Sequence, residues 1–263
     1  MSAATVLARS VRAEGIRLGG GRGLLLRVAL PLGLGLPVAV TLAVAAVSEK
    51  LHGADSLLQV RQVPTSNSVY WLVYLGVTVF AVVAAYAQGT AVRGPAAEVT
   101  RHGAPRPLTG MLGRWILVGA ASALGMVMCA FLLMVALPAL FPAVYGQMEV
   151  ASAEGIRLLW ALPAYAFLAV GIGVAVGALV PWPAAAVAVL TLWALFIENA
   201  AVMLPGGGDL IGWMPFLNGV YASGQEIALS PSWGRDGALA YVAAVTAVLL
   251  AAGWARLRGE RAR

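Results

Sequence analysis

Charge, histidine and cysteine are scarce in this chain. Only 11% of its 263 residues are charged, and histidine occurs twice, as His52 and His102. Both histidines lie outside the apolar segments, which excludes a haem held between two histidines inside a membrane. The single cysteine, Cys129, cannot form a disulfide within the chain. We expect Cys129 to be a small packing residue.

Sequence motifs of common enzymes are missing as well. The chain has no HExxH zinc motif, no Walker A glycine–lysine loop and no GxSxG nucleophile motif. The apolar segments contain no pair of carboxylates. These absences argue against an intramembrane protease, a haem-carrying respiratory subunit and a proton pump. We therefore expect no catalytic residue, metal ligand or cofactor on this chain.

Apolar residues are abundant instead, at 61% of the chain, compared with about 45–50% in a soluble domain. A helix that spans a membrane needs about 20 largely apolar residues. Six segments meet this requirement: residues 24–47, 69–92, 115–137, 158–180, 184–204 and 238–255. We predict an all-α polytopic membrane protein with one membrane domain over residues 1–263. A leader at 1–23 precedes the spans, and a basic tail at 256–263 follows them.

The first apolar segment has a competing interpretation as a signal peptide. Ala43, Val44 and Ala45 resemble a cleavage site. The apolar run is longer than the roughly 7–15 residues of a signal peptide, however. Because five more spans follow, we interpret the segment as an anchored helix.

Arginine is distributed unevenly between the two sides of the predicted spans. Thirteen of the seventeen basic residues fall on one side: Arg9, Arg12, Arg17, Arg22, Arg27, Arg93, Arg101, Arg106, Arg114, Arg256, Arg258, Arg261 and Arg263. Loops rich in Lys and Arg stay in the cytoplasm. Both termini are therefore predicted to be cytoplasmic, in agreement with an even number of spans. The basic ends are interpreted as orientation signals and lipid-headgroup contacts, and nucleic-acid binding is not expected.

The leader has the pattern of an amphipathic helix. Leu7, Val11 and Leu18 share one stripe on a 3.6-residue period, and Glu14 lies on the same stripe. Arg9, Arg12 and Arg17 avoid it. Such a helix lies along the membrane interface, either as a simple anchor or as a connecting helix that meets a cytoplasmic partner through Glu14.

A second candidate docking surface is the loop at residues 93–114. Residues 96–102 are predicted to form a short helix with Pro95 at its start. Its polar groups would be Glu98, Arg101 and His102. The alternative is a charged, solvated loop without a partner.

The segment before the last span is apolar and aromatic but too short to cross a membrane. Gly206–Gly208 are followed by the sequence IGWMPFLNGVYA. Trp213, Phe216, Tyr221 and Trp233 suit the headgroup level of the membrane. Two interpretations remain: an aromatic belt that seats the loop, or a re-entrant lid over an outward exit.

Glu198 is the single carboxylate within a predicted span, and Asn199 follows it. It lies about six residues from the end of the span, roughly 9 Å deep. A charged group in a membrane helix costs about 2.5–3.5 kcal/mol near the centre, so it usually faces the bundle interior or a wet cavity. Glu198 has two functional interpretations, a lining group of a transport path or a proton-linked switch, and a structural one, a hydrogen-bonded packing residue between helices.

The order of these parts resembles a known family. RAEG (12–15) lies in the basic leader, and EVTRHGAPRPLTGMLGRW (98–115) follows the second span. GALVPWPAAAVAVLTLWALFIEN (177–199) and a WMPF-containing outer segment come later. This arrangement resembles the ABC-2-type (type V) permeases of ATP-binding cassette transporters, in particular the half-size six-span subunits of actinobacteria.

The resemblance implies an exporter in a bacterial plasma membrane, built from two permease subunits, identical or different, and two separate ATPase subunits that carry ATP and Mg²⁺. It implies docking of the ATPase through Arg12, Glu14, Arg17, Glu98, Arg101, His102 and Arg106. It also implies an exit gate at residues 211–222, with Glu198, Asn199, Trp213, Phe216 and Tyr221 on the path or the gate. The substrate stays open among lipids, glycans, peptides and drugs.

Two other functions are considered beside the permease. The first is a structural or assembly subunit of a larger membrane complex, with no transport path of its own. The second is a secondary transporter, which needs ion-coupling groups near the midplane of the membrane. Glu198 is the only such group, and no clear inverted repeat is present.

Overall fold

The computed structural model describes residues 3–20, 23–52, 62–93, 97, 106–227 and 230–262. These residues form helices and connecting turns, with no strand among them. Six helices are long and apolar enough to cross a membrane: Leu25–Lys50, Thr65–Val92, Pro107–Leu140, Ala153–Leu179, Pro183–Val202 and Gly234–Glu260. The chain is an all-α polytopic membrane protein, as predicted.

The spans are joined from shorter helical pieces. The first contains η1 (Leu25–Ala29), η2 (Pro31–Gly35) and α2 (Leu36–Lys50), and the second contains η3 (Thr65–Asn67), η4 (Leu72–Gly76) and α3 (Val77–Val92). The third is α5 (Pro107–Leu140), the fourth is α7 (Ala153–Leu179), and the fifth joins α8 (Pro183–Leu192), η5 (Trp193–Ile197) and α9 (Glu198–Val202). The sixth lies in α12 (Gly234–Ala262). Among these pieces η1, η2, η4 and η5 are π-helical. The π-helix is rare in proteins overall, but where it occurs it often lies at a functional site.

Shorter helices lie outside the six spans. The leader forms α1 (Ala3–Gly19), and α6 (Pro142–Tyr145) follows the third span. Between the fifth and sixth spans lie α10 (Gly207–Leu210), η6 (Ile211–Trp213) and α11 (Pro215–Ala222). The predicted amphipathic leader helix and the helical segment before the last span are both present.

The second and fourth spans form the centre of the bundle. In each of these two spans, 67% of the apolar 18-residue window is buried, against 22–28% of the corresponding window in the other four spans. Helices α3 and α7 approach closely because Gly173 and Gly177 face the backbone of Ala81 and Ala85, where no Cβ would fit. Small residues allow such contacts in membranes. Cys129 packs against the edge of this core.

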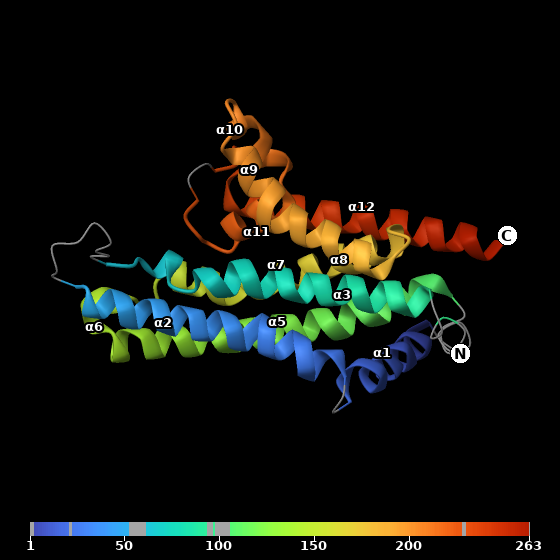
Figure 1. Cartoon of the computed structure of the whole chain (residues 1–263), viewed down its shortest axis with the longest axis horizontal. Helices are drawn as coiled ribbons and strands as arrows, with labels where there is room; N and C mark the ends of the chain where they lie inside the picture. Colours follow the sequence, from blue (N-terminus) through green and yellow to red (C-terminus); the bar gives the residue numbers. More distant parts are fainter. Residues whose placement is uncertain are drawn as a thin grey trace.

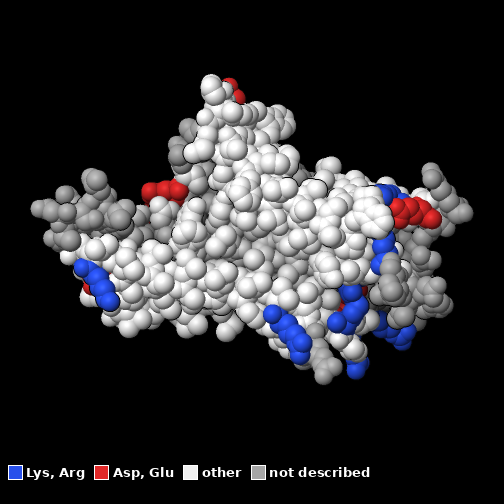
Figure 2. Space-filling view, in the orientation of Figure 1, with Lys and Arg blue, Asp and Glu red and all other residues white. Residues whose placement is uncertain are grey.

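The two ends of the bundle differ in composition. Both termini and α1 lie at one end, called here the terminal end, and α6 lies at the opposite, far end (Figure 1). On the face shown in Figure 2, most Lys and Arg side chains gather at the terminal end. In the view of Figure 1, α9, which ends the fifth span, and the short helix α10 that follows it lie apart from the remaining helices.

Candidate functional site

A buried ion pair fastens the leader helix α1 to the bundle. The Arg114 guanidinium contacts the Glu14 carboxylate and also donates to the Gln88 side-chain oxygen. Arg114 is only 1% exposed, and Gln88 is fully buried. Removing one partner of a buried ion pair costs about 3–5 kcal/mol because the other charge is left without compensation. Helix α1 is therefore fixed directly to the third span through Arg114, which in turn bonds Gln88 on the second span.

Other contacts reinforce this joint. Arg17 donates from Nε to the Glu14 carboxylate at 2.8 Å and from a terminal nitrogen to the Ala87 carbonyl at 3.2 Å. The Ser10 hydroxyl donates to the Thr109 carbonyl at 3.1 Å. Ser10 also lies against Gly113, where a larger residue would collide with it. We call Glu14, Arg17, Gln88 and Arg114 the leader joint.

The predicted stripe of the leader is the side that faces the bundle. Leu18 and Glu14 are buried, and Leu7 and Val11 are half-buried. Glu14 thus points into its own chain and not toward an exposed docking surface. The sequence assigns Arg114 only to the orientation signal, so it does not predict the ion pair of Arg114 with Glu14.

The remaining docking candidates divide into two groups. Arg12 is exposed on α1, and Arg106 is exposed just before α5. Glu98, Arg101 and His102 lie outside the described residues, as does the predicted helix at 96–102 except for Ala97.

Glu198 caps the first turn of the half-helix α11. Its carboxylate accepts hydrogen bonds from the backbone N–H groups of Phe216 at 3.1 Å and Leu217 at 2.7 Å. The Trp193 indole donates to the same carboxylate at 2.8 Å. The free N–H groups and positive dipole at a helix N-terminus favour such an acceptor. Since Glu198 is completely buried, it is a hydrogen-bonded group between helices and not an exposed lining group.

The other end of α11 is held by a cation. Arg157 donates from Nε to the Ala222 carbonyl at 2.9 Å and pairs with Asp236 at 2.8 Å. A positive charge suits the C-terminus of a helix, where carbonyl groups are free. Along the side of α11, Gly219 lies against the Tyr165 ring with no space for a Cβ. Helix α11 is therefore fixed to the fourth, fifth and sixth spans.

The segment that leads into α11 is also internally bonded. Its chain breaks from the fifth span at Gly206, which has a left-handed backbone with φ of 79°. The Asn218 amide donates to the carbonyls of Ile211 at 2.8 Å and Met214 at 2.9 Å. Trp233 donates to the Asn218 oxygen at 3.0 Å. Residues 211–222 thus fold as one compact unit, which we call the half-helix unit.

The four aromatic residues predicted for this segment occupy different environments. Phe216 is buried, at 3% exposure, whereas Trp213 and Trp233 are exposed at 71% and 44%. The Tyr221 ring lies under the Arg235 guanidinium at 5.9 Å. Of the predicted path and gate residues, Glu198 and Phe216 are therefore in contact. Trp213 is exposed instead, and Tyr221 contacts Arg235.

Asn199 lies at a pocket beside the half-helix unit. The Asn199 amide donates to the Tyr74 hydroxyl and to the Leu195 carbonyl. The Tyr74 ring stacks on Tyr70 with 5.7 Å between ring centroids. The pocket has a volume of about 380 Å³ and is lined by Tyr70, Tyr74, Asn199, Val202, Met203, Ile211, Leu217, Val220 and Ile227. Sequence analysis missed Tyr74; its one local signal is the aromatic cluster that opens the second span.

The described part of the chain holds no group of three or more His, Cys, Asp or Glu side chains that could bind a metal ion. Comparisons of the chain with protein-family models, with curated proteins and with solved structures find no match. Function therefore has to be inferred from the geometry of the chain itself.

Proposed function

We propose that this chain is the membrane-spanning permease subunit of an ATP-binding cassette exporter, driven by an ATPase on a separate chain. The observation that carries the proposal is the leader joint, which fastens an amphipathic interfacial helix to the second and third spans. A helix attached in this way can transmit a movement on the cytoplasmic side to the central spans of the bundle.

Charge supports the orientation that this mechanism requires. The thirteen basic residues of the leader, the second-to-third connection and the tail support a cytoplasmic position for both termini. On α1, Arg12 faces away from the bundle and is available to a partner. Arg106 is exposed at the start of α5, close to the same end. In this proposal both arginines contact the ATPase, which binds ATP and Mg²⁺.

The half-helix unit supplies the second moving part. Glu198 on the fifth span and Arg157 on the fourth hold its two ends, so a relative movement of these spans would displace α11. In this proposal α11 gates the exit on the far side of a bacterial plasma membrane. The pocket at Tyr74 and Asn199 lies beside the gate. A second permease subunit would complete the path, and the four spans in which only 22–28% of the apolar window is buried leave surface for its contact.

The test is affinity purification from native membranes in a mild detergent, followed by mass spectrometry of the proteins retained. A stoichiometric companion with a Walker A motif is expected. Reversing the charge with Arg12→Glu should reduce its recovery, whereas Arg258→Glu, an exposed arginine on α12, serves as the matched control. If only integral membrane proteins accompany the chain, the proposal is wrong and a structural or assembly subunit is favoured.

A further inference from the structure

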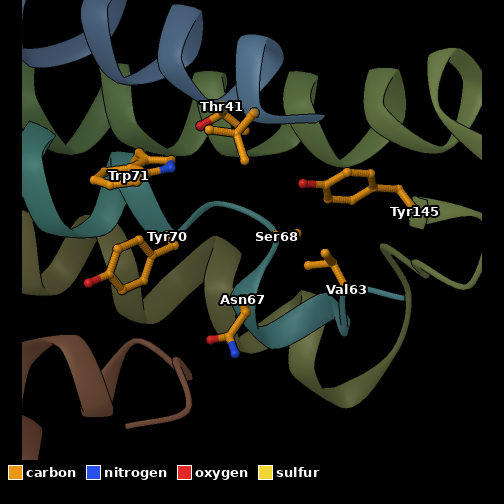
Figure 3. Close-up of a pocket in the computed structure, with 8 residues that line it drawn as sticks. Thr41, Val63, Asn67, Ser68, Tyr70, Trp71 and Tyr145 are labelled. Atoms are coloured by element: carbon orange, nitrogen blue, oxygen red, sulfur yellow. The ribbon is translucent and has the colours of Figure 1, made fainter. Parts of the chain in front are cut away.

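A second pocket lies at the far end and shares Tyr70 with the pocket beside the half-helix unit. It has a volume of about 280 Å³, close to the lower limit of small-molecule pockets. Its lining residues come from the first span, the start of the second span with a residue shortly before it, and α6: Thr41, Val44, Val63, Asn67, Ser68, Tyr70, Trp71 and Tyr145 (Figure 3). We call it the far-end pocket.

Hydrogen bonds from neighbouring segments hold the wall that carries Tyr145. The Glu49 carboxylate, at the end of the first span, accepts from the backbone N–H groups of Ala143 at 3.0 Å and Val144 at 3.1 Å. Val63 donates its N–H to the Val144 carbonyl at 3.0 Å. Helix α6 is thereby fixed at one wall of the pocket, and Tyr145 is placed opposite Trp71 of the second span (Figure 3).

Two hydrogen-bond donors point into this space from opposite walls. Figure 3 shows the Trp71 ring nitrogen and the Tyr145 hydroxyl directed toward the centre, whereas the Tyr70 hydroxyl points away. Within the described ranges, neither Trp71 Nε1 nor the Tyr145 hydroxyl donates to an acceptor. Burial raises the pKa of Tyr145, so its hydroxyl keeps the proton at neutral pH.

The other polar groups of the lining bond within the chain or are directed away from the centre, as Figure 3 shows for the Asn67 amide and the Tyr70 hydroxyl. The Thr41 and Ser68 hydroxyls donate to the carbonyls of Pro37 and Thr65, each at 2.8 Å. Asn67 accepts from the Glu226 N–H at 3.1 Å. Among the described residues of the lining, none carries a charge. The groups directed into the pocket without a partner are thus two neutral donors. Such donors suit an uncharged oxygen acceptor better than a phosphate, since proteins bind phosphate mainly through Arg and Lys.

The pocket opens toward the membrane side of the first span. Val44 is 42% exposed and lines the pocket, and Val47 on the same helix is 57% exposed. Trp and Tyr at the end of a span occupy the interfacial layer of a bilayer. A ligand can therefore have its polar part between Trp71 and Tyr145 and its apolar part along Val44.

We propose that the far-end pocket binds the glycerol-ester region of a membrane phospholipid. Trp71 and Tyr145 donate to an ester carbonyl, and one acyl chain follows the first span past Val44. This site is separate from the half-helix unit, and the proposal does not depend on the exporter function.

The test compares an ester lipid with its ether analogue, which lacks the carbonyl groups. The purified, delipidated full-length protein is mixed with dipalmitoylphosphatidylglycerol or with the dihexadecyl ether lipid of the same headgroup. Retained lipid is then counted by native mass spectrometry. We expect retention of the ester lipid to exceed that of the ether lipid about fivefold, the effect of one net hydrogen bond. Equal retention of the two lipids would overturn the proposal.

Variants assign the preference to the pocket. The double substitution Trp71→Phe with Tyr145→Phe should abolish the ester preference. The matched control, Trp182→Phe with Tyr86→Phe, changes exposed residues of the same types elsewhere and should keep it. A preference that survives the first double substitution contradicts the assignment.

A filling variant tests the site with both donors intact. Val44→Trp, placed at the exposed rim, should lower retention of the ester lipid about fivefold or more by occupying the acyl path. Undiminished retention would place the lipid elsewhere. Dipalmitoylglycerol, which has the ester carbonyls but no phosphate, should keep the preference over its diether. Loss of the preference in this pair would show that the ester preference requires the phosphate, and would contradict recognition of the ester carbonyl by the pocket.

Discussion

The leader joint and the half-helix unit each contain a buried carboxylate, but the two carboxylates have different partners. Glu14 contacts two guanidinium groups, those of Arg17 and Arg114. Glu198 accepts only from N–H groups, two of the backbone and one of an indole. The first arrangement depends on compensation of charge, and the second depends on the free N–H groups of a helix end.

This difference gives the two regions different mechanical properties. An ion pair buried at 1% and 8% side-chain exposure is costly to separate, because both charges would need new partners. Releasing Glu198 breaks a helix cap, worth about 0.5–2 kcal/mol, and separates no ion pair, but the buried carboxylate then needs new donors. In the proposed permease the leader joint is therefore the rigid element, and the contact of Glu198 with α11 is the one that can open.

The largest effect is expected from Arg114→Met, which leaves Glu14 buried without its main partner. We expect a loss of about 3–5 kcal/mol in the free energy of unfolding. Thermal or denaturant unfolding of the purified protein in detergent measures it. The double variant Arg114→Met with Glu14→Met should recover most of the loss, because apolar residues can replace a buried ion pair. Additive losses in the double variant would contradict a direct coupling of the two side chains.

A smaller, local effect is expected from Glu198→Ala. The substitution leaves the N–H groups of Phe216 and Leu217 without acceptors, at a cost of about 1–3 kcal/mol. Hydrogen exchange of the amides in residues 211–222 should accelerate, while exchange in α3 and α7 stays unchanged. Glu198→Gln keeps one acceptor oxygen and should give an intermediate rate. The carboxylate control is Glu226→Gln, whose side chain accepts from Ser66 at the surface. Equal exchange in all three variants would show that Glu198 does not hold α11.

The spans could be predicted from the sequence because a membrane imposes long apolar runs, but their ends could not. The third span was predicted at residues 115–137, after the charge of Arg114, whereas α5 begins at Pro107. Here the apolar count places the boundary directly after Arg114. The helix continues through it because Glu14 and Gln88, from distant parts of the chain, compensate the guanidinium.

The same limit applies to the half-helix unit. Glu198 could be recognised from the sequence, since a lone carboxylate in an apolar run requires a partner. Its partners are backbone N–H groups, however, and every residue except proline has one. Likewise, the contact between Asn199 and Tyr74 joins positions 125 residues apart and has no local signature beyond the aromatic residues near Tyr74. Local patterns identify the unusual residue, and only the fold identifies what it contacts.

The smallest effect is expected at a second carboxylate of the terminal end. Glu260 also faces two arginines, Arg256 at 3.1 Å and Arg93 at 3.7 Å, but its side chain is 45% exposed against 8% for Glu14. Water screens such a pair, so Glu260→Gln should change the free energy of unfolding by less than about 0.5 kcal/mol. The same unfolding experiment, with Glu14→Gln beside it, provides the comparison. A loss of stability at Glu260 as large as that at Glu14 would mean that the negative charge, which lowers the positive net charge of this end, stabilises the bundle whether or not the carboxylate is buried. A loss confined to Glu14 would assign the strength of the leader joint to burial.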